Sequence, residues 1–298
     1  MSLAPFDRTA NKDARAAAED PRTYALGYTE GEFKRLTLQG AFIGDLTEDV
    51  LRRAGIGPGA RVLDIGCGMG DVSILAAGLV GPSGAVLGID RSADVVAQAQ
   101  RRAVACGLDW VRFAATELDR FSSDEQFDAV IGRLILLYLP DPSATLRDLV
   151  RHLRPGGIVA FQEYEMSLCR SVPDTPLFRQ CRGWFLSTFE RSGFEVDMGT
   201  KLSATYLRAG LPAPQMIAAA RVEAGADSPV YEFLAATLRS LLPVAERLGV
   251  VTAVEVDIDT LAERLRREAV EHNSCIMPPT LIGAWTRTTV PGANSQRA

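Results

Sequence analysis

The feature that most constrains the fold is the segment 62–71 (VLDIGCGMGD), in which a short apolar run passes directly into a glycine-rich turn. The run at 61–66 predicts a strand, and the apolar pattern of 71–80 predicts a helix. Glycine tolerates the positive φ angles of such a turn and lets a bound molecule approach the backbone closely. The N-terminus of the helix adds unpaired N–H groups and a partial positive charge. The segment therefore predicts a strand–turn–helix unit that binds a ligand.

The same alternation of short apolar runs with helical patterns continues as far as residue 164. Strands are expected at 61–66, 85–90, 111–116, 127–133 and 158–164, and helices at 71–80, 92–106 and 142–153. Strands that alternate with helices of this length form βαβ units with a parallel sheet, and their crossovers are right-handed. Two later runs, at 214–224 and 281–288, are expected to complete the sheet. The predicted fold is α/β: a three-layer, doubly wound, Rossmann-like sandwich around a mostly parallel seven-stranded sheet.

Outside this core the chain is expected to be mostly helical. Residues 23–55 have apolar positions at helical spacing, and Gly40 and Gly44 are expected to split that helix. Further helices are expected at 175–192, 200–210, 229–248 and 259–271, which predicts a helical insertion over the edge of the sheet. The predicted organisation is a flexible N-terminus (1–22), a helical segment (23–55), an α/β core (56–165), a helical cap with the last two strands (166–289) and a flexible tail (290–298).

Composition excludes several classes of function. The chain has 37 acidic and 32 basic residues, a formal charge of −5, without a block rich in Lys and Arg. We therefore expect neither nucleic acid nor a membrane as a partner. No apolar run reaches the ~18 residues that span a bilayer, and the N-terminal segment lacks the apolar stretch of a secretory signal. Five cysteines without a CxxC pair and two histidines favour a cytoplasmic protein without a disulfide framework or a histidine-based metal site.

Two acidic residues at the ends of predicted strands indicate what the glycine-rich turn binds. Dinucleotide-binding proteins place a GxGxxG loop against a pyrophosphate, whereas the spacing here is GxGxG. Asp64 would lie close to the bound molecule, where a carboxylate repels a pyrophosphate and attracts an amine. Asp90 ends the next strand, 26 residues later, where a carboxylate can accept hydrogen bonds from a ribose diol. The alternative role of Asp90 is to cap the helix that begins near Ser92.

Five motifs occur in order along the core: GCGMG after the first strand, Asp90, ATEL (115–118), LYLPDP (137–142) and RPGG (154–157). Over about residues 36–165 the chain thereby resembles the class I S-adenosylmethionine-dependent methyltransferases. It resembles most the bacterial small-molecule methyltransferases, which include those of quinone and natural-product metabolism. The resemblance implies that 56–165 binds S-adenosyl-L-methionine and that the chain methylates a small molecule (EC 2.1.1.-). It also implies that 23–55 folds over the cofactor as a lid.

The resemblance assigns roles to residues of the cofactor site. The methionine part of the cofactor would be held by Gly66, Gly68 and Gly70, with Asp64 near its amino group and Cys67 beside it as a small residue. Asp90 would bind the ribose hydroxyls with Arg91 at its side, Glu117 would contact the adenine amino group, and Leu118 would offer its backbone N–H to the ring. Arg133 and Leu134 would line the methionine and sulfonium end. Tyr28, Arg35 and Gln39 are the polar candidates of the lid, and Gln39 could bond the methionine carboxylate.

Several of these assignments have structural alternatives. Glu117 could be a solvated loop acid, and Arg133 could form a structural ion pair. The segment 23–55 could equally be a surface helix with ordinary polar residues. The thiol of Cys67 gives no reason to expect covalent chemistry.

A general base is needed only if the acceptor is a hydroxyl or a protonated amine. The best-placed candidates are Glu163 and Tyr164, beyond the fifth strand at the carboxyl edge of the sheet, although both could instead cap the next helix. Glu165, Tyr138 and His272 are further candidates, and His272 has the alternative role of a cation at the end of a helix. We expect no metal, because the Asp–Asp–Asn arrangement of metal-dependent catechol methyltransferases is absent.

The acceptor itself is not identified by the sequence. Residues 20–45, 165–210 and 226–280 should roof its pocket, and their aromatic side chains favour a partly apolar or aromatic molecule. Two other functions stay open: an NAD-linked oxidoreductase on the same fold, and a cofactor-binding protein of this fold without methyl transfer. The sequence also leaves open whether the chain forms a homodimer.

Overall fold

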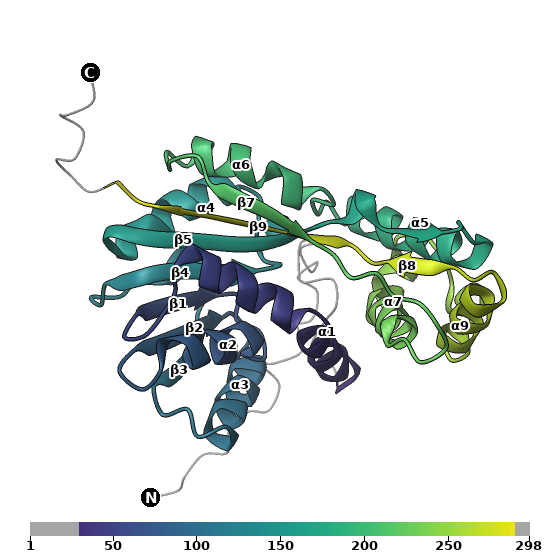
Figure 1. The fold of residues 1–298 in the computed structure, drawn as a ribbon, viewed down its shortest axis with the longest axis horizontal. Helices are drawn as coiled ribbons and strands as arrows, with labels where there is room; N and C mark the ends of the chain where they lie inside the picture. The colour runs from purple at the N-terminus through teal and green to yellow at the C-terminus, as the bar shows by residue number, and fades with distance from the viewer. Residues whose placement is uncertain (1–29, 290–298) are drawn as a thin grey trace, which may run out of the picture.

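A seven-stranded sheet forms the centre of the computed structural model, which describes residues 30–289 (Figure 1). Its strands are β1 (Arg61–Ile65), β2 (Ala85–Asp90), β3 (Val111–Ala115), β4 (Phe127–Arg133), β5 (Leu153–Glu165), β7 (Gln215–Ala219) and β9 (Thr280–Arg287). The spatial order is β3-β2-β1-β4-β5-β9-β7. The first five strands in this order pair in parallel, and β9 is antiparallel to both of its neighbours. The predicted mostly parallel seven-stranded α/β sheet is confirmed.

The fifth strand is longer than predicted. The motif RPGG (154–157), which precedes the strand predicted at 158–164, lies inside β5. The pairing of β5 with β4 shifts register between Phe127 and Ala129, and this irregularity accommodates the motif within the strand.

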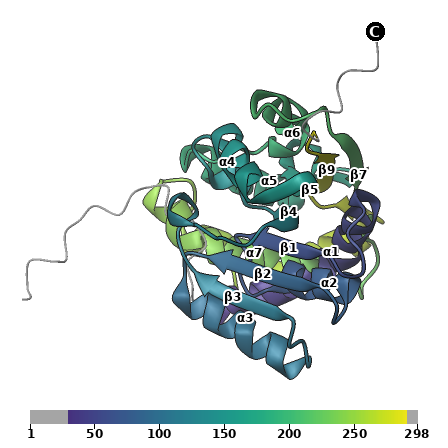
Figure 2. The same cartoon turned by 90° about the vertical axis from the view of Figure 1, so that its left-hand side faces the viewer.

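Helices cover both faces of the sheet, as Figure 2 shows for α2 (Asp71–Val80) and α3 (Ala93–Ala105) on one side and α4 (Pro142–Leu149) and α6 (Met198–Arg208) on the other. Successive strand residues point to opposite faces. Val62, Ala129 and Ile158 accordingly pack in the core under α2, whereas Leu63, Val130 and Val159 pack in the core under α4 and α6. The sheet is therefore apolar on both faces, as expected for buried parallel strands.

The N-terminal helix α1 (Glu30–Ala54) runs for 25 residues without the predicted break at its two glycines. Gly40 lies against α2, where a β-carbon at this position would meet the carboxylate of Asp71 at 2.7 Å. A small residue therefore permits close packing of the two helices there rather than ending α1. The predicted flexible ends 1–22 and 290–298, the start of the predicted lid and its candidate Tyr28 lie outside the described residues.

The C-terminal cap is a second packed unit beside the sheet (Figure 1). It consists of α5 (Pro176–Arg191), α7 (Val230–Arg247), α8 (Ala253–Val256), α9 (Leu261–Glu271) and a small antiparallel pair, β6 (Arg170–Val172) and β8 (Cys275–Met277). The pair β6–β8 was not predicted, because three-residue strands are too short to show alternation. The cap has its own core, which reaches α1 through the stacked rings of Phe42 and Phe233, 4.8 Å apart.

No helix within residues 30–289 combines the length and the hydropathy that crossing a bilayer requires.

Helix α6 offers a matched pair of leucines that tests the sheet–helix core. Leu202 is fully buried, and Leu207 is 55% exposed on the same helix. We expect Leu202→Ala to lower the free energy of unfolding by about 2–5 kcal/mol, because it leaves a cavity, and Leu207→Ala to change it by less than about 0.5 kcal/mol. Urea unfolding measures both values. Equal losses in the two variants would contradict this packing of α6.

Candidate active site

The carboxyl ends of β1, β2 and β4 meet at one edge of the sheet, beside a large cavity. The strand order reverses between β1 and β4, and open α/β sheets bind their ligands at such a switch point. The cavity has a volume of about 1050 Å³, and its lining comes from the loops after these strands and from α1, α5 and α7. Small-molecule pockets usually measure roughly 300–1,000 Å³. The cavity is thus large enough for a cofactor and an acceptor together.

The glycine-rich turn forms one wall of the cavity. Gly66, Gly68 and Gly70 have φ angles of 62°, 52° and 80°, a region that L-residues with side chains rarely adopt. A β-carbon on Gly66 would meet Ile135 at 2.7 Å, and one on Gly70 would meet Phe113 at 2.8 Å. A β-carbon on Gly68 would meet nothing within 4 Å. The outer glycines therefore permit close packing, and Gly68 exposes bare backbone to the cavity together with Cys67.

Asp90, at the end of β2, holds the glycine-rich turn in place. Its carboxylate accepts hydrogen bonds from the backbone N–H groups of Gly68 at 3.1 Å and Ser92 at 3.0 Å, and the residue lines the cavity. The side chain that caps α3 is that of Ser92, which accepts from the N–H of Val95. The alternative interpretation of Asp90 as the helix cap is therefore wrong. Arg91 lies beside Asp90 in the cavity lining, as the resemblance implies.

Asp64 does not have the position that the charge argument gave it. Its side chain is 1% exposed and accepts a hydrogen bond of 2.6 Å from the hydroxyl of Ser73 on α2. It is not among the residues that line the cavity. Burial raises the pKa of this carboxyl to about 7. Asp64 thus joins β1 to α2, and its position outside the cavity lining contradicts the prediction that it faces a bound amine.

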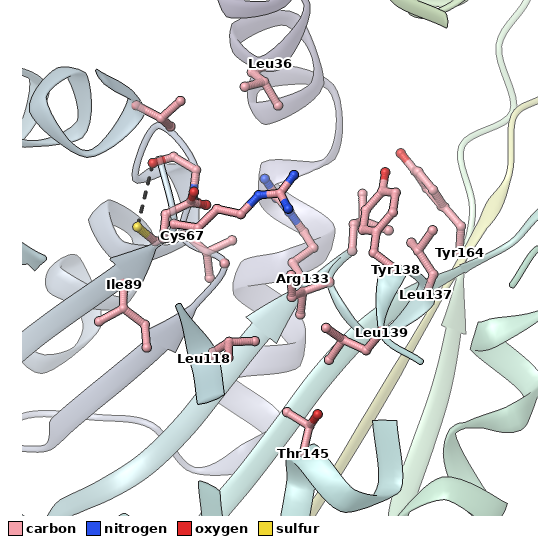
Figure 3. A pocket seen from close by; sticks show the side chains of 18 of the residues that line it. Leu36, Cys67, Ile89, Leu118, Arg133, Leu137, Tyr138, Leu139, Thr145 and Tyr164 are labelled. Atoms are coloured by element: carbon pink, nitrogen blue, oxygen red, sulfur yellow. Dashed lines mark hydrogen bonds between the residues drawn. The ribbon is translucent and has the colours of Figure 1, made fainter. Parts of the chain in front are cut away.

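Glu117 and Leu118 lie at the far end of the cavity from α1, where β3 ends. Both residues line the cavity, with Glu117 immediately before the short 3-10 helix Leu118–Arg120. Figure 3 shows the Leu118 side chain directed into the space between Ile89 and Leu139. This end is therefore a slot with apolar sides and a carboxylate at its rim.

Arg133 is the last residue of β4, Leu134 follows it, and both line the cavity. Figure 3 shows Arg133 between Cys67 on one side and Tyr138 and Tyr164 on the other. The Arg133 guanidinium donates to the hydroxyl of Thr47 on α1 at 2.9 Å, and no carboxylate within the described part of the chain forms an ion pair with it. The alternative of a structural ion pair is therefore wrong.

Helix α1 contributes Arg35, Leu36 and Gln39 to the cavity wall. Gln39 is 8% exposed and accepts a hydrogen bond from the Arg35 guanidinium. Arg35 is also paired with Glu32, one turn earlier, at 2.6 Å. The helix therefore closes one side of the cavity with a chain of hydrogen-bonded polar groups rather than with an isolated charge.

The predicted base Glu163 is buried and does not line the cavity. Its Oε1 accepts hydrogen bonds from the backbone N–H groups of Ile135 at 3.0 Å and Leu136 at 2.8 Å. Its Oε2 is buried without a partner in the described structure, and burial raises the pKa of the carboxyl to about 8. Glu163 thus fixes the loop after β4 instead of reaching the reacting atoms.

Of the other base candidates, Tyr138 and Tyr164 line the cavity, whereas Glu165 and His272 do not. Tyr164 and Tyr138 line the cavity, and burial raises both pKa values, that of Tyr164 to about 12. Glu165 is engaged by the hydroxyl of Ser167 at 2.6 Å and the backbone N–H of Thr200 at 2.9 Å. His272 ends α9 on the surface, where its Nδ1 lies 2.9 Å from the carbonyl oxygen of Glu268, so the prediction that it is a base is wrong. Only the two tyrosines reach the cavity.

The sequence interpretation missed several charged residues of the cavity lining, among them Arg182 on α5. Arg182, Phe185, Leu186 and Phe189 all line the cavity, at the spacing i, i+3, i+4 and i+7 of one helical face. The available signal was an arginine placed within an otherwise apolar stripe. In residues 30–289, no group of three or more His, Cys, Asp or Glu side chains is arranged to hold a metal ion.

The buried carboxyl of Glu163 predicts a pH dependence of stability. Its pKa is about 8 in the folded protein against 4.5 for the free group, so the folded state keeps a proton that the unfolded state releases between about pH 4.5 and pH 8. Stability from this group is therefore lost as the pH rises through that window. Glu163→Gln cannot ionise, and we expect its stability relative to the wild type to increase from about pH 5 to about pH 9 in urea unfolding. The exposed control Glu190→Gln should show a constant difference, and the same constancy in Glu163→Gln would contradict the assignment.

Comparison with known proteins shows that part of the chain is similar to methyltransferases. A family model described as "Methyltransferase domain" matches residues 56–184. The 2-phytyl-1,4-naphtoquinone methyltransferase of Synechococcus elongatus is 37% identical over 133 residues, which are 43% of this chain and 54% of that protein. The trans-aconitate 2-methyltransferase of Azoarcus sp. is 30% identical over 131 residues, 43% of this chain and 49% of that protein. The chain spans about half the length of the curated relatives it matches.

A solved structure extends the likeness over more of the fold. Phosphoethanolamine N-methyltransferase 2 of Haemonchus contortus, in complex with phosphomonomethylethanolamine and S-adenosylhomocysteine, superposes with a TM-score of 0.51 at 16% identity. The match covers 83% of this chain and 52% of that one. Sheet order, glycine-rich turn and sequence similarity agree in supporting a class I S-adenosylmethionine-dependent methyltransferase domain at residues 56–184.

Proposed function

We propose that this chain binds S-adenosyl-L-methionine in the cavity and transfers its methyl group to a small, partly apolar acceptor. The observation that carries the proposal is the pairing of bare backbone at Gly68 with the carboxylate of Asp90 at the switch point of the sheet. A nucleoside needs close backbone approach and a carboxylate for its two ribose hydroxyls, and both are present at one place.

The lining residues match the parts of S-adenosylmethionine along the length of the cavity. Asp90 is suited to the ribose, and the slot at Glu117 and Leu118 is suited to adenine. The Arg133 guanidinium, which has no carboxylate partner in the described chain, is suited to the methionine carboxylate. Gln39 on α1 faces the same region and is a second candidate for that carboxylate. We propose α1 as the wall that closes this end.

When bound, the cofactor supplies a methyl group on a sulfonium, which is already activated for transfer. The work left to the protein is to orient the acceptor and to exclude water, which can contribute roughly 7–11 kcal/mol to lowering a barrier. Tyr138 and Tyr164 are neutral at physiological pH, as tyrosines ordinarily are, and burial raises their pKa values further. They are therefore suited to donate hydrogen bonds rather than to remove protons. The described lining thus favours an acceptor that needs no strong base.

The residues also support a small acceptor in preference to a polymer. The cavity is bounded by α1 on one side and by α5 and α7 of the cap on the other. The two relatives named above carry a naphthoquinone and trans-aconitate in their names, and each matches 43% of this chain. The family model ends at residue 184, before α7, α8 and α9, so these helices of the cap are candidates for setting an acceptor of this chain's own.

Removal of the Asp90 carboxylate tests the ribose assignment. We expect Asp90→Ala to weaken binding of S-adenosylhomocysteine by about 10- to 100-fold, corresponding to the roughly 1.5–3 kcal/mol of hydrogen bonds to a charged group. Isothermal titration calorimetry measures the affinity. The control Asp94→Ala removes an exposed carboxylate from the first turn of α3 and should bind as the wild type does. Unchanged affinity in a folded Asp90→Ala protein would show that the ribose lies elsewhere.

A second variant tests whether the bare backbone at Gly68 is part of the cofactor site. Gly68→Ala places a methyl group into open cavity space, so we expect it to reduce affinity for S-adenosylhomocysteine by at least about 10-fold. Gly59→Ala is the matched control, because Gly59 also has a positive φ, of 81°, but lies outside the cavity lining. Both variants should lose about 1 kcal/mol or more of stability through backbone strain, measured by thermal unfolding. Equal affinity of the two variants would contradict the assignment.

A further inference from the structure

One wall of the cavity has a composition unlike the rest, and we call it the acceptor wall. It consists of Arg182, Phe185, Leu186 and Phe189 on α5 and Phe233 and Leu234 on α7. Among the described lining residues from Tyr164 to the C-terminal end, Arg182 is the one charged side chain. The acceptor wall therefore presents a single guanidinium in an apolar and aromatic surface.

The Arg182 guanidinium is incompletely satisfied by the protein. Its Nη2 donates to the carbonyl oxygen of Ser167 at 3.1 Å, and its Nε is buried without a hydrogen-bond partner. No ion pair joins it to a carboxylate of residues 30–289, although Arg179, one turn earlier on α5, is paired with Asp174. A partly exposed guanidinium that lines the cavity without an anionic partner is suited to pair with an anionic group of a bound molecule.

The other charged residues of the cavity lining do not provide an anionic partner for Arg182. The acidic lining residues belong to the segments around β2, β3, α2 and α4, on the cofactor side, and Asp71 among them is paired with Arg102 at 2.7 Å. S-adenosylmethionine carries one carboxylate, for which Arg133 beside the glycine-rich turn is suited. Arg35 is already paired with Glu32. The other arginines of the lining, Arg91, Arg120 and Arg151, are exposed. Arg182 is therefore the partly buried guanidinium for which neither the cofactor nor an ion pair within residues 30–289 supplies an anion.

We infer that the acceptor is an apolar or aromatic molecule that carries an anionic group, a carboxylate or an ionised hydroxyl, and that this group pairs with Arg182. This inference rests on the proposed function for the position of the cofactor. A guanidinium binds such oxygen anions through paired N–H donors, and the aromatic surface around it fits a planar or hydrocarbon body. A cationic acceptor would instead meet Arg182 and Arg133 without a compensating acid on the acceptor wall.

Two ionisable groups near Arg182 are neutral, which is consistent with a preference for an anionic acceptor. Cys169 and Tyr164 line the same end of the cavity, and burial raises the pKa of each to about 12. Neither group therefore adds negative charge beside Arg182 at physiological pH. The acceptor wall is positively charged because Arg182 lies on it, whereas the acidic residues of the lining belong to the segments around β2, β3, α2 and α4.

Matched acid and amide probes test the inference. We would measure binding of benzoate, trans-cinnamate and 2-naphthoate, and of the three corresponding primary amides, to the full chain saturated with S-adenosylhomocysteine. Each pair has the same shape and differs in charge. We expect at least one acid to bind about 10-fold or more tightly than its amide to the wild type. This ratio should fall to about 1 in Arg182→Gln, persist in part in Arg182→Lys, and remain at its wild-type value in the control Arg179→Gln.

The outcomes separate this inference from the proposed function. Failure of S-adenosylhomocysteine itself to bind would overturn the proposed function. If S-adenosylhomocysteine binds normally but no acid binds more tightly than its amide, only the inference of an anionic acceptor would be overturned. The same conclusion would hold if S-adenosylhomocysteine binds and none of the probes does. An acid preference that survives in folded Arg182→Gln would show that another group selects the charge. Circular dichroism of each variant checks that it is folded.

Discussion

The parallel pairing of β1 with β2 on one side and β4 on the other is the constraint on which the site depends. It brings the carboxyl ends of three strands to one edge, at the point where the strand order reverses. The chain leaves β1 into α2 on one face of the sheet, and the loop after β4 leads to α4 on the other. The loops therefore diverge and leave a space between them, which the sheet bounds from beneath and α1 and the cap bound from above.

Within this frame three carboxyl groups fix the backbone around the cavity. Asp90 bonds to the glycine-rich turn, Glu163 bonds to the loop after β4, and Asp64 joins β1 to α2. Burial raises the pKa values of Asp64 and Glu163 to about 7 and about 8, so both carboxyls have a reason to retain protons that ordinary carboxyls lose. The backbone around the cavity is thus fixed in part by groups outside its lining, whereas Gly68, Arg133, Tyr138 and Tyr164 are among the residues that line it.

Most of the fold could be predicted from the sequence because strand and helix periods are local properties. It was harder to predict from the sequence which side of the sheet an individual side chain occupies. Asp64 lies two residues after the buried Val62 and shares its face toward α2, so period-2 alternation could have placed it away from the cavity. Glu163 and His272 could not be placed, because the loop that covers Glu163 and the distance of α9 from the cavity are tertiary features. The strands β6 and β8 are too short to leave a pattern.

The cofactor residues were predictable for a different reason than the acceptor residues. Glycines and acids at strand ends report a fixed geometry at the edge of the sheet, and the family resemblance covers that half of the chain. Arg182 belongs to the cap, where an arginine in an apolar helical stripe is ambiguous until the packing of α5 against the cavity is known. The family model ends at residue 184, so α7, α8 and α9 of the cap lie outside the part of the chain that it describes.

The finding that Asp64 is turned away removes the charge argument against a dinucleotide, so the choice of cofactor now depends on Gly68, Asp90 and the family match. Calorimetric titration of the wild-type chain with S-adenosylhomocysteine and, separately, with NADH tests this choice most directly. The account predicts one site per chain for S-adenosylhomocysteine and no heat of binding with NADH. Tight binding of NADH together with no binding of S-adenosylhomocysteine would contradict it.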